Sequence, residues 1–133
     1  MTSINTKIFA FLVILASNSS VFAEWVKLGE NSRMVMYADS AIRRLGDTAT
    51  GWVLYDYKQM QVSQVSGKRY LTEKDQIEVN CMKEKKRAIY VYWYDGNMGE
   101  GVVVYTDNKP REWEPTSAPE TVASLIASYF CKK

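Results

Sequence analysis

The chain has 133 residues, with 17 lysines and arginines against 15 aspartates and glutamates, and 47% of its residues are hydrophobic. A formal net charge of only +2 argues against partners held by bulk charge, such as nucleic acids and anionic membranes. Histidine is absent, which removes the usual general base, the usual zinc ligand and the histidine-activated nucleophiles. We therefore expect a non-enzymatic protein without a cofactor or a metal.

Residues 1–23 have the three-part organisation of a secretion signal. Lys7 precedes the apolar run 8–16, small polar residues follow, and residues 21–23 carry the small-residue pattern of a cleavage site. The apolar run is too short to cross a bilayer, which needs about 20 residues, and no other run approaches that length. We expect an exported chain without a transmembrane helix, in which cleavage leaves one domain, residues 24–133.

Cys81 and Cys131 are an even number of cysteines in an exported chain, and we predict that they form one disulfide. In the chain-entropy model, a bridge that closes the long loop between these two cysteines stabilises the fold by roughly 4 kcal/mol. The alternative is two free thiols. Neither cysteine lies at the cleavage site, so we expect no lipid anchor there. The chain should reside in the periplasm, at the cell surface or outside the cell.

Alternating apolar and polar residues predict a sheet of about six strands. The predicted strands are residues 25–28, 33–37, 52–57, 68–81, 88–94 and 102–105. Within the fourth of them, Ile77, Val79 and Cys81 share one face, so Cys81 should point toward whatever covers the sheet. Between the second and the third, Asp39 and Gly46 are residue types that begin and end a short helical turn.

The strand 88–94 has two contrasting faces. The apolar face consists of Ile89, Val91 and Trp93. The opposite face is a tyrosine row, formed by Tyr90, Tyr92 and Tyr94, which Tyr55, Tyr57 and Tyr105 would extend. A glycine-rich loop, residues 95–101, then leads into the next strand as a hairpin. It is not a phosphate-binding loop, because that motif requires a helix to follow.

A C-terminal helix is predicted to cover the apolar face of the sheet. Ser117 and Glu120 fit a capping box at its start. An apolar stripe follows at helical spacing, formed by Val122, Leu125, Ile126 and Tyr129. Cys131 lies on the opposite side of an ideal helix from Val122, so a bridge to Cys81 requires the last turn to unwind near Phe130.

Two surface features are candidates for binding a partner. The tyrosine row is one, because tyrosine is amphipathic and enriched at interfaces; the alternative is an ordinary sheet face or a contact between two copies in a homodimer. The other is a basic segment that would attract a polyanion or a host protein, formed by Lys83, Lys85, Lys86 and Arg87. Its alternative is a solvated connection between strands, although Lys68 and Arg69 would join it if the strands pair accordingly. A hydrolase would instead need Asp56, Asp95 or Glu100 in a common buried pocket.

Several short motifs resemble those of a known family. They are Lys68-Arg69-Tyr70 with Asn80-Cys81, the run Tyr94-Asp95-Gly96-Asn97-Met98-Gly99-Glu100-Gly101, Trp113-Glu114-Pro115, and the helix that ends at Cys131. Through them residues 24–133 resemble the surface-adhesin protein E-like domains of Gram-negative bacteria. The resemblance implies an α+β fold, in which a single antiparallel sheet of about six strands carries a C-terminal helix on one face, tethered by a disulfide.

The resemblance also implies a function. The founding member of the family is an outer-membrane lipoprotein adhesin that binds host extracellular-matrix and serum proteins. The first hypothesis for this chain is therefore an exported, non-enzymatic protein-binding module, with the tyrosine row and the basic segment as candidate binding residues. The alternative is a soluble periplasmic envelope protein of structural or stress-related role that meets no host ligand.

Overall fold

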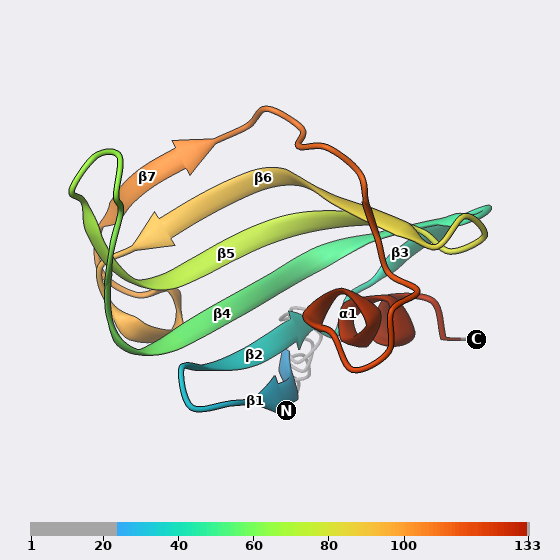
Figure 1. Ribbon diagram of the computed structural model, residues 1–133, viewed down its shortest axis with the longest axis horizontal. Helices are drawn as coiled ribbons and strands as arrows, with labels where there is room; N and C mark the ends of the chain where they lie inside the picture. Colours follow the sequence, from blue (N-terminus) through green and yellow to red (C-terminus); the bar gives the residue numbers. More distant parts are fainter. Residues whose placement is uncertain (1–23, 133) are drawn as a thin grey trace, which may run out of the picture.

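The computed structural model describes residues 24–132, so the predicted secretion signal lies outside the described residues. One antiparallel sheet, in the order β1-β2-β4-β5-β6-β7 with β3 paired to β4 and β8 to β6, carries the helix α1 (Figure 1). The elements are β1 (Trp25–Glu30), β2 (Met34–Asp39), β3 (Arg43–Leu45), β4 (Thr48–Val62), β5 (Arg69–Asn80), β6 (Lys85–Tyr94), the 3-10 turn η2 (Asn97–Gly99), β7 (Val103–Asp107), β8 (Glu114–Pro115) and α1 (Val122–Phe130). The predicted α+β class is confirmed, and the sheet has eight strands because β3 and β8 add short pairs.

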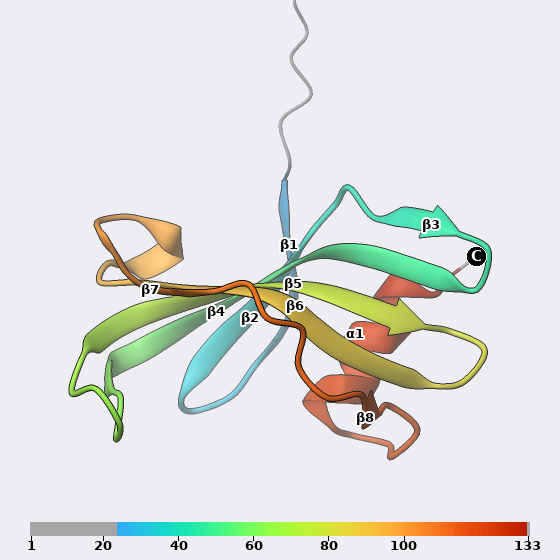
Figure 2. The ribbon, with the colours of Figure 1, turned by 90° about the horizontal axis from the view of Figure 1, so that it is seen from above.

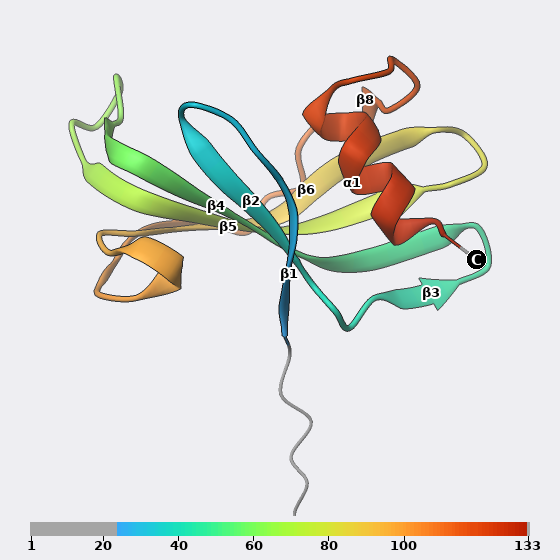
Figure 3. The ribbon, with the colours of Figure 1, turned by 90° about the horizontal axis from the view of Figure 1, so that it is seen from below.

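The two faces of the sheet differ in what covers them. α1 lies on one face, which we call the helix face, whereas β3 and the glycine-rich loop lie toward the other, the open face (Figures 2 and 3). Side chains alternate between the faces along the long central strands. On β5, the buried Asp75, Ile77 and Val79 lie on the helix face, and Lys74 and Gln76 lie on the open face.

The core lies between the helix face and α1. Its buried side chains include Met36, Ala38, Ala49, Val53, Ile77, Val79, Ala88, Val91, Ile126 and Phe130. Phe130 reaches the sheet because β4 has a glycine at position 51, where a Cβ would lie 3.2 Å from the Phe130 ring. The predicted helix stripe is only partly right, since Ile126 is fully buried but Val122 and Leu125 are 39% and 37% exposed. Phe130 supplies the apolar area that those two do not.

The predicted disulfide between Cys81 and Cys131 is present. α1 ends at Phe130, and Cys131 is its C-cap with non-helical backbone angles, so the unwinding that the bridge requires occurs there. Arg44 in β3 donates a hydrogen bond from its Nε to the carbonyl oxygen of Phe130 at 3.0 Å. The C-terminal end of the helix is therefore tied to the sheet at two points, by a covalent bond to the residue after β5 and by a hydrogen bond from β3.

The start of the helix lies at Val122, so the capping box predicted from Ser117 is wrong. Glu120 has a left-handed φ of 60°, which an α-helix does not accommodate, and the helix begins only after it. Thr121 is the N-cap, and its Oγ1 accepts the N–H of Ser124 at 3.1 Å while the Ser124 Oγ accepts the N–H of Thr121 at 3.2 Å. A capping box therefore exists, but it starts at Thr121, directly after the left-handed residue Glu120.

The helical turn predicted between Asp39 and Gly46 is a β-hairpin instead. β3 pairs with the beginning of β4, with Leu45 opposite Thr48, and Gly46 opens the turn between them with a φ of 61°. Glycine with positive φ suits both a tight hairpin turn and the end of a helix, so its position alone did not distinguish the two.

A β-bulge interrupts the alternation predicted for β6. Gln76 pairs with Tyr90 and Ile77 pairs with Ala88, which leaves Ile89 without a residue opposite to it. Ala88 therefore takes the core position expected for Ile89. The remaining two residues of the predicted apolar face do lie on the helix face.

Aromatic side chains, rather than α1, cover the other half of the helix face. Tyr70 stacks on Trp93 with ring centroids 4.1 Å apart, Tyr105 lies 4.4 Å from Trp93, and Tyr57 meets Tyr70 edge-on at 5.9 Å. Tyr55 is buried on the same face. The expected extension of the tyrosine row is therefore wrong, because Tyr55, Tyr57 and Tyr105 lie on the opposite face of the sheet.

Candidate functional site

The tyrosine row lies on the open face of the sheet. Tyr90 and Tyr92 have nearly parallel rings, with an interplanar angle of 11° and centroids 6.4 Å apart. Tyr94 continues the row with its centroid 6.5 Å from that of Tyr92. This spacing follows from strand geometry, because every second residue points to the same face at intervals of about 6.6 Å. The three tyrosines are therefore brought together as the alternation predicts.

Two side chains from neighbouring strands extend this row. The Trp52 ring on β4 lies 5.9 Å from the Tyr92 ring on β6, centroid to centroid. Lys74, on the intervening strand β5, places its Nζ 4.8 Å from the centre of the Trp52 ring, in a cation–π contact. We call these five residues the aromatic patch: Trp52, Lys74, Tyr90, Tyr92 and Tyr94.

Sequence reasoning missed Trp52 and Lys74 as site residues. Period-two alternation assigns a side chain to a face of its own strand, but it does not say which residues of separate strands come opposite each other. In the folded sheet Trp52 pairs with Gln76, which pairs in turn with Tyr90. That register brings tryptophan and tyrosine together from positions far apart in the chain.

No helix or strand among residues 24–132 packs over the aromatic patch. Tyr90 is 40% exposed. A hollow of about 560 Å³ lies toward β3, where its lining includes Arg43, Thr48, Thr50 and Glu78. A second hollow, of about 390 Å³, lies between β6 and β7, where its lining includes Tyr90, Tyr92 and Thr106. The patch is accessible mainly at Tyr90, since its other four residues are half-buried, and a hollow lies on either side of it.

The glycine-rich loop is fixed to the open face by two polar side chains. Asp56 Oδ1 accepts hydrogen bonds from the Asn97 side-chain nitrogen and from the backbone N–H of Met98, both at 2.9 Å. Thr72 Oγ1 accepts the N–H of Gly99 at 3.1 Å and donates its own proton to a loop carbonyl. The loop is therefore held in one conformation at the end of the aromatic patch.

Hydrogen bonds engage two of the three carboxylates that a hydrolase would need, Asp56 and Asp95. Asp95 Oδ1 accepts the N–H of Val102 at 2.8 Å, and Gly101, with a φ of 83°, leaves the space that this carboxylate occupies. Asp56 is engaged by the loop, and Glu100 is exposed. These carboxylates do not share the buried pocket that a hydrolase would need.

The basic segment is divided by the fold rather than gathered into one patch. Lys86 is buried on the helix face, where its Nζ contacts the Glu114 carboxylate at 2.9 Å. Arg87 lies on the open face, where its Nε contacts Glu78 at 2.8 Å and its guanidinium lies 4.4 Å from the centre of the Trp113 ring. Only Lys83 and Lys85 remain exposed without such contacts among the described residues.

Lys68 and Arg69 do not join the basic segment. Arg69 begins β5 and Lys68 directly precedes it, whereas Lys85 pairs with Asn80 at the far end of the same strand. The Lys68 Nζ donates to the backbone carbonyl of Val104 in β7 at 3.0 Å. This lysine covers part of the edge strand instead of extending a cationic surface.

A groove of about 400 Å³ lies on the helix face, between the first turns of α1 and the β1–β2 hairpin. Its apolar walls are formed by Met34, Met36, Val122 and Leu125. α1 is most deeply buried in its C-terminal half, at Ile126 and Phe130, and the groove lies beside its first turns, where Leu125 approaches Gly29 of β1.

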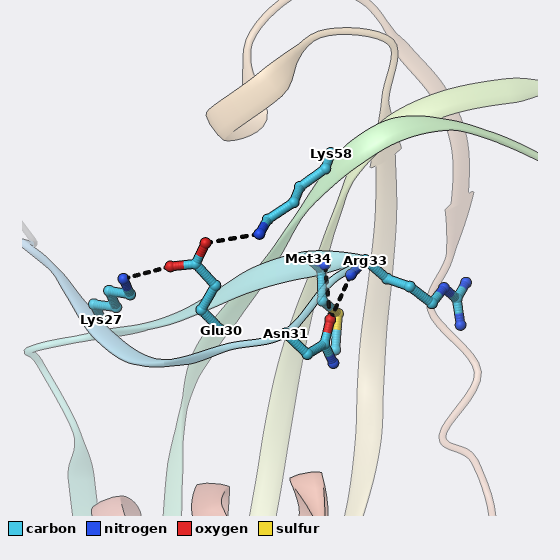
Figure 4. A network of polar contacts seen from close by, with 6 residues as sticks. All are labelled: Lys27, Glu30, Asn31, Arg33, Met34 and Lys58. Atoms are coloured by element: carbon cyan, nitrogen blue, oxygen red, sulfur yellow. Dashed lines mark hydrogen bonds and ion pairs between the residues drawn. The ribbon is translucent and has the colours of Figure 1, made fainter.

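Polar contacts fix the shape of the hairpin beside that groove (Figure 4). The Glu30 carboxylate contacts the Nζ atoms of Lys27 and Lys58, each at 2.7 Å, and these two contacts lower the pKa of Glu30 to about 2. Asn31 Oδ1 accepts the N–H groups of residues 33 and 34 at 2.8 and 2.9 Å, which closes the turn. The hairpin is thereby joined to β4 through Lys58.

One carboxyl group is buried on the helix face. Asp75 is only 5% exposed, and its Oδ1 has no hydrogen-bond partner among residues 24–132. Burial, followed by the neighbouring Glu73 carboxyl group, raises the pKa of Asp75 well above its ordinary value, although Arg111 and Lys86 oppose the shift. Asp75 therefore keeps its proton to a higher pH than an exposed aspartate does.

Residues 24–132 contain no group of three or more His, Cys, Asp or Glu side chains placed to hold a metal ion. In the same part of the chain, no helix has the length and apolar character needed to cross a membrane.

The fold is similar to that of Haemophilus influenzae protein E. Crystal form II of that protein superposes with a TM-score of 0.64 at 17% sequence identity, covering 90% of this chain and 96% of that one. Another structure of the same protein gives a TM-score of 0.62 at 16% identity, covering 85% and 87%. Protein E from non-typeable Haemophilus influenzae gives 0.57 at 16% identity, covering 83% and 76%. At this level of identity the likeness shows the fold.

Sequence comparison supplies the family. Curated protein sequences give no significant match. The family model described as Surface-adhesin protein E matches residues 25–132, from the first strand through the disulfide at the end of the helix. The chain belongs to the Surface-adhesin protein E family.

Proposed function

We propose that residues 1–23 direct export and that the remaining chain is a non-enzymatic adhesin module, which binds a host extracellular-matrix or serum protein through the aromatic patch. Membership of a surface-adhesin family supports a protein at the cell surface. The secretion signal expected from the sequence supports export.

The observation that carries this proposal is the aromatic patch itself. The rings of the patch lie side by side on the open face, where Tyr90 is 40% exposed, whereas Tyr55 on the helix face is buried. Tyrosine and tryptophan have large apolar areas and few rotatable bonds, so they lose little entropy when a partner covers them. These two residue types dominate the energetics of protein interfaces.

Solid-phase binding to a panel of matrix and serum proteins tests the proposal. Tyr90→Ser should weaken binding at least tenfold, because truncating an interface aromatic commonly costs about 2 kcal/mol. Leu125→Ser is the matched control, since Leu125 is 37% exposed, close to the 40% of Tyr90, but lies on the helix face. Equal binding by both variants, with folding verified by circular dichroism, would exclude the aromatic patch.

Location is tested separately by protease treatment of intact cells, followed by fractionation. A surface protein is digested in intact cells, whereas a protein confined to the periplasm is protected until the outer membrane is opened. Protection in intact cells would replace the adhesin proposal with a soluble periplasmic envelope protein of structural or stress-related role.

A further inference from the structure

We infer that the aromatic patch accepts an acidic, extended polypeptide segment, which crosses β4, β5 and β6 with its carboxylates toward the β3 end of the open face. This inference rests on the proposed function, because it specifies the kind of protein surface that the patch would bind.

The open face offers positive charge that is not neutralised within the described residues. Arg43 lies opposite Thr50, and Lys85 lies opposite Asn80, so both side chains belong to this face. Neither they nor Lys74 form an ion pair among residues 24–132. These three cations are available to a partner.

The carboxylates of the same sheet face are already engaged. Glu78 contacts Arg87 at 2.8 Å, so these two opposite charges offset each other. Asp56 accepts two hydrogen bonds from the glycine-rich loop. Those hydrogen bonds come from neutral groups, so Asp56 keeps its charge, whereas Asp107 beside the hollow between β6 and β7 lies 3.9 Å from the Arg111 guanidinium. The three cations without an ion pair, Arg43, Lys74 and Lys85, therefore outnumber the carboxylate of Asp56 on this sheet surface.

This charge has a direction along the open face. Arg43 lies at the β3 end, and Lys74 lies centrally over Trp52. The opposite end is bounded by the glycine-rich loop, where Glu100 is exposed. An acidic segment is attracted to the β3 end and the centre, and is repelled by the loop end.

The two hollows favour an extended partner. The hollow of about 560 Å³ adjoins β3 and β4, and the hollow of about 390 Å³ adjoins β6 and β7. A segment with side chains in both must cross the rings of the aromatic patch. Aromatic rings together with charges are the composition of a protein-binding surface, whereas an anionic polysaccharide needs mainly the charges.

Fluorescence anisotropy with labelled synthetic peptides tests this inference on the exported form of the chain. The probes are a peptide of alternating glutamate and tyrosine, its counterpart of alternating glutamine and tyrosine, and a heparin oligosaccharide. We expect the glutamate peptide to bind more tightly than the glutamine peptide at low ionic strength, and this difference should shrink as salt is added.

Charge-removing variants then locate the effect. Arg43→Gln and Lys74→Gln should each weaken binding of the glutamate peptide by about two- to fivefold. Arg43→Gln, which changes a residue outside the aromatic patch, should leave binding of the glutamine peptide nearly unchanged. Lys132→Gln makes the same change of charge beyond the end of α1 and should have no effect. Tyr90→Ser should weaken binding of both peptides.

The outcomes separate this inference from the proposed function. Equal affinity for the two peptides, or no binding of the glutamate peptide, overturns the acidic preference. A second result also overturns the acidic preference: Tyr90→Ser loses binding to the host protein, whereas Arg43→Gln and Lys74→Gln keep it. That result leaves the proposed function standing. Binding of heparin alone, sensitive to the two charge variants, would make the partner an anionic polysaccharide and overturn the inference.

Discussion

The Asp56 carboxylate accepts the backbone N–H of Met98 at 2.9 Å, although the two residues lie 42 positions apart in the sequence. This contact joins β4 to the glycine-rich loop, and the same oxygen also accepts the side-chain nitrogen of Asn97. Beneath the loop, Leu54 is only 1% exposed. Asp56, together with Thr72, thus holds the loop over an apolar side chain of the open face.

Asp56→Ala should lower the free energy of unfolding by about 1.5–3 kcal/mol, because hydrogen bonds to a charged group contribute about that much. The Met98 amide proton should also exchange faster with solvent, which hydrogen-exchange NMR measures residue by residue. Asp56→Asn keeps one acceptor oxygen, so its free energy of unfolding should fall by less than that of the alanine variant. Unchanged protection of the Met98 amide in the alanine variant would mean that the loop is held without Asp56.

Phe130, rather than Leu125, should carry the stability of the helix contact. Phe130→Ala should lower the free energy of unfolding by about 3–5 kcal/mol, the usual cost of truncating a buried aromatic. Leu125 is 37% exposed, so Leu125→Ala should cost less than about 1.5 kcal/mol. Urea denaturation of the two variants compares them, and a larger loss for Leu125→Ala would contradict the packing described above.

The disulfide should account for a separate part of the stability. Cys131→Ser should lower the free energy of unfolding by about 2–5 kcal/mol, as loss of a native bridge does in small exported domains. Wild-type protein in reductant should unfold at about the same urea concentration as the variant, and the variant itself should not respond to reductant. A variant as stable as the oxidised wild type would show that the bridge adds nothing.

Asp75 should make the protein less stable as the pH rises. Below about pH 4 the carboxyl group is protonated in both the folded and the unfolded chain, and it favours neither. As the pH rises above that point, the unfolded chain releases this proton first, because the pKa of Asp75 is raised only in the folded state. Stability due to this group therefore falls until the pH passes the folded-state pKa.

Asp75→Asn removes that titration. The variant should be more stable than the wild type at pH 7, and the difference should shrink toward pH 4. Thermal unfolding across this pH range measures it, with Glu112→Gln as a control, since Glu112 is an exposed carboxylate. A variant that is less stable than the wild type at pH 7 would mean that the ionised Asp75 has a partner in the folded protein.

The alternation of apolar and polar residues and the number of cysteines were enough to predict most of the fold. Alternation in residues 68–81 placed Ile77 and Val79 in the core, and the cysteine count gave the bridge. Phe130 was missed because its burial depends on Gly51, which lies 79 positions earlier and offers no helical signal of its own. The hairpin at Gly46 was missed because a glycine with positive φ ends helices as readily as it turns strands.

The candidate site was predicted only where it lies on a single strand. Tyr90, Tyr92 and Tyr94 share a face by alternation alone. Trp52 and Lys74 join them through the register of three strands, which single-strand periodicity does not contain. The basic segment is divided for a different reason, because alternation within β6 itself sends Lys86 and Arg87 to opposite faces of the sheet.

The bulge at Ile89 divides β6 into two segments, and alternation in one segment does not determine which side chains of the other face the core. Ala88 before it and Val91 after it both face the core, three positions apart, where unbroken alternation would turn one of them outward. Deletion of Ile89 would restore regular alternation and leave every other side chain of the strand on its present face. If Ile89 were instead paired without a bulge, unbroken alternation from Ala88 would send Tyr90, Tyr92 and Tyr94 into the core and expose Val91. The chemical character of the open face thus depends on the parity of a residue count, and the same tyrosines could form a core or a binding surface.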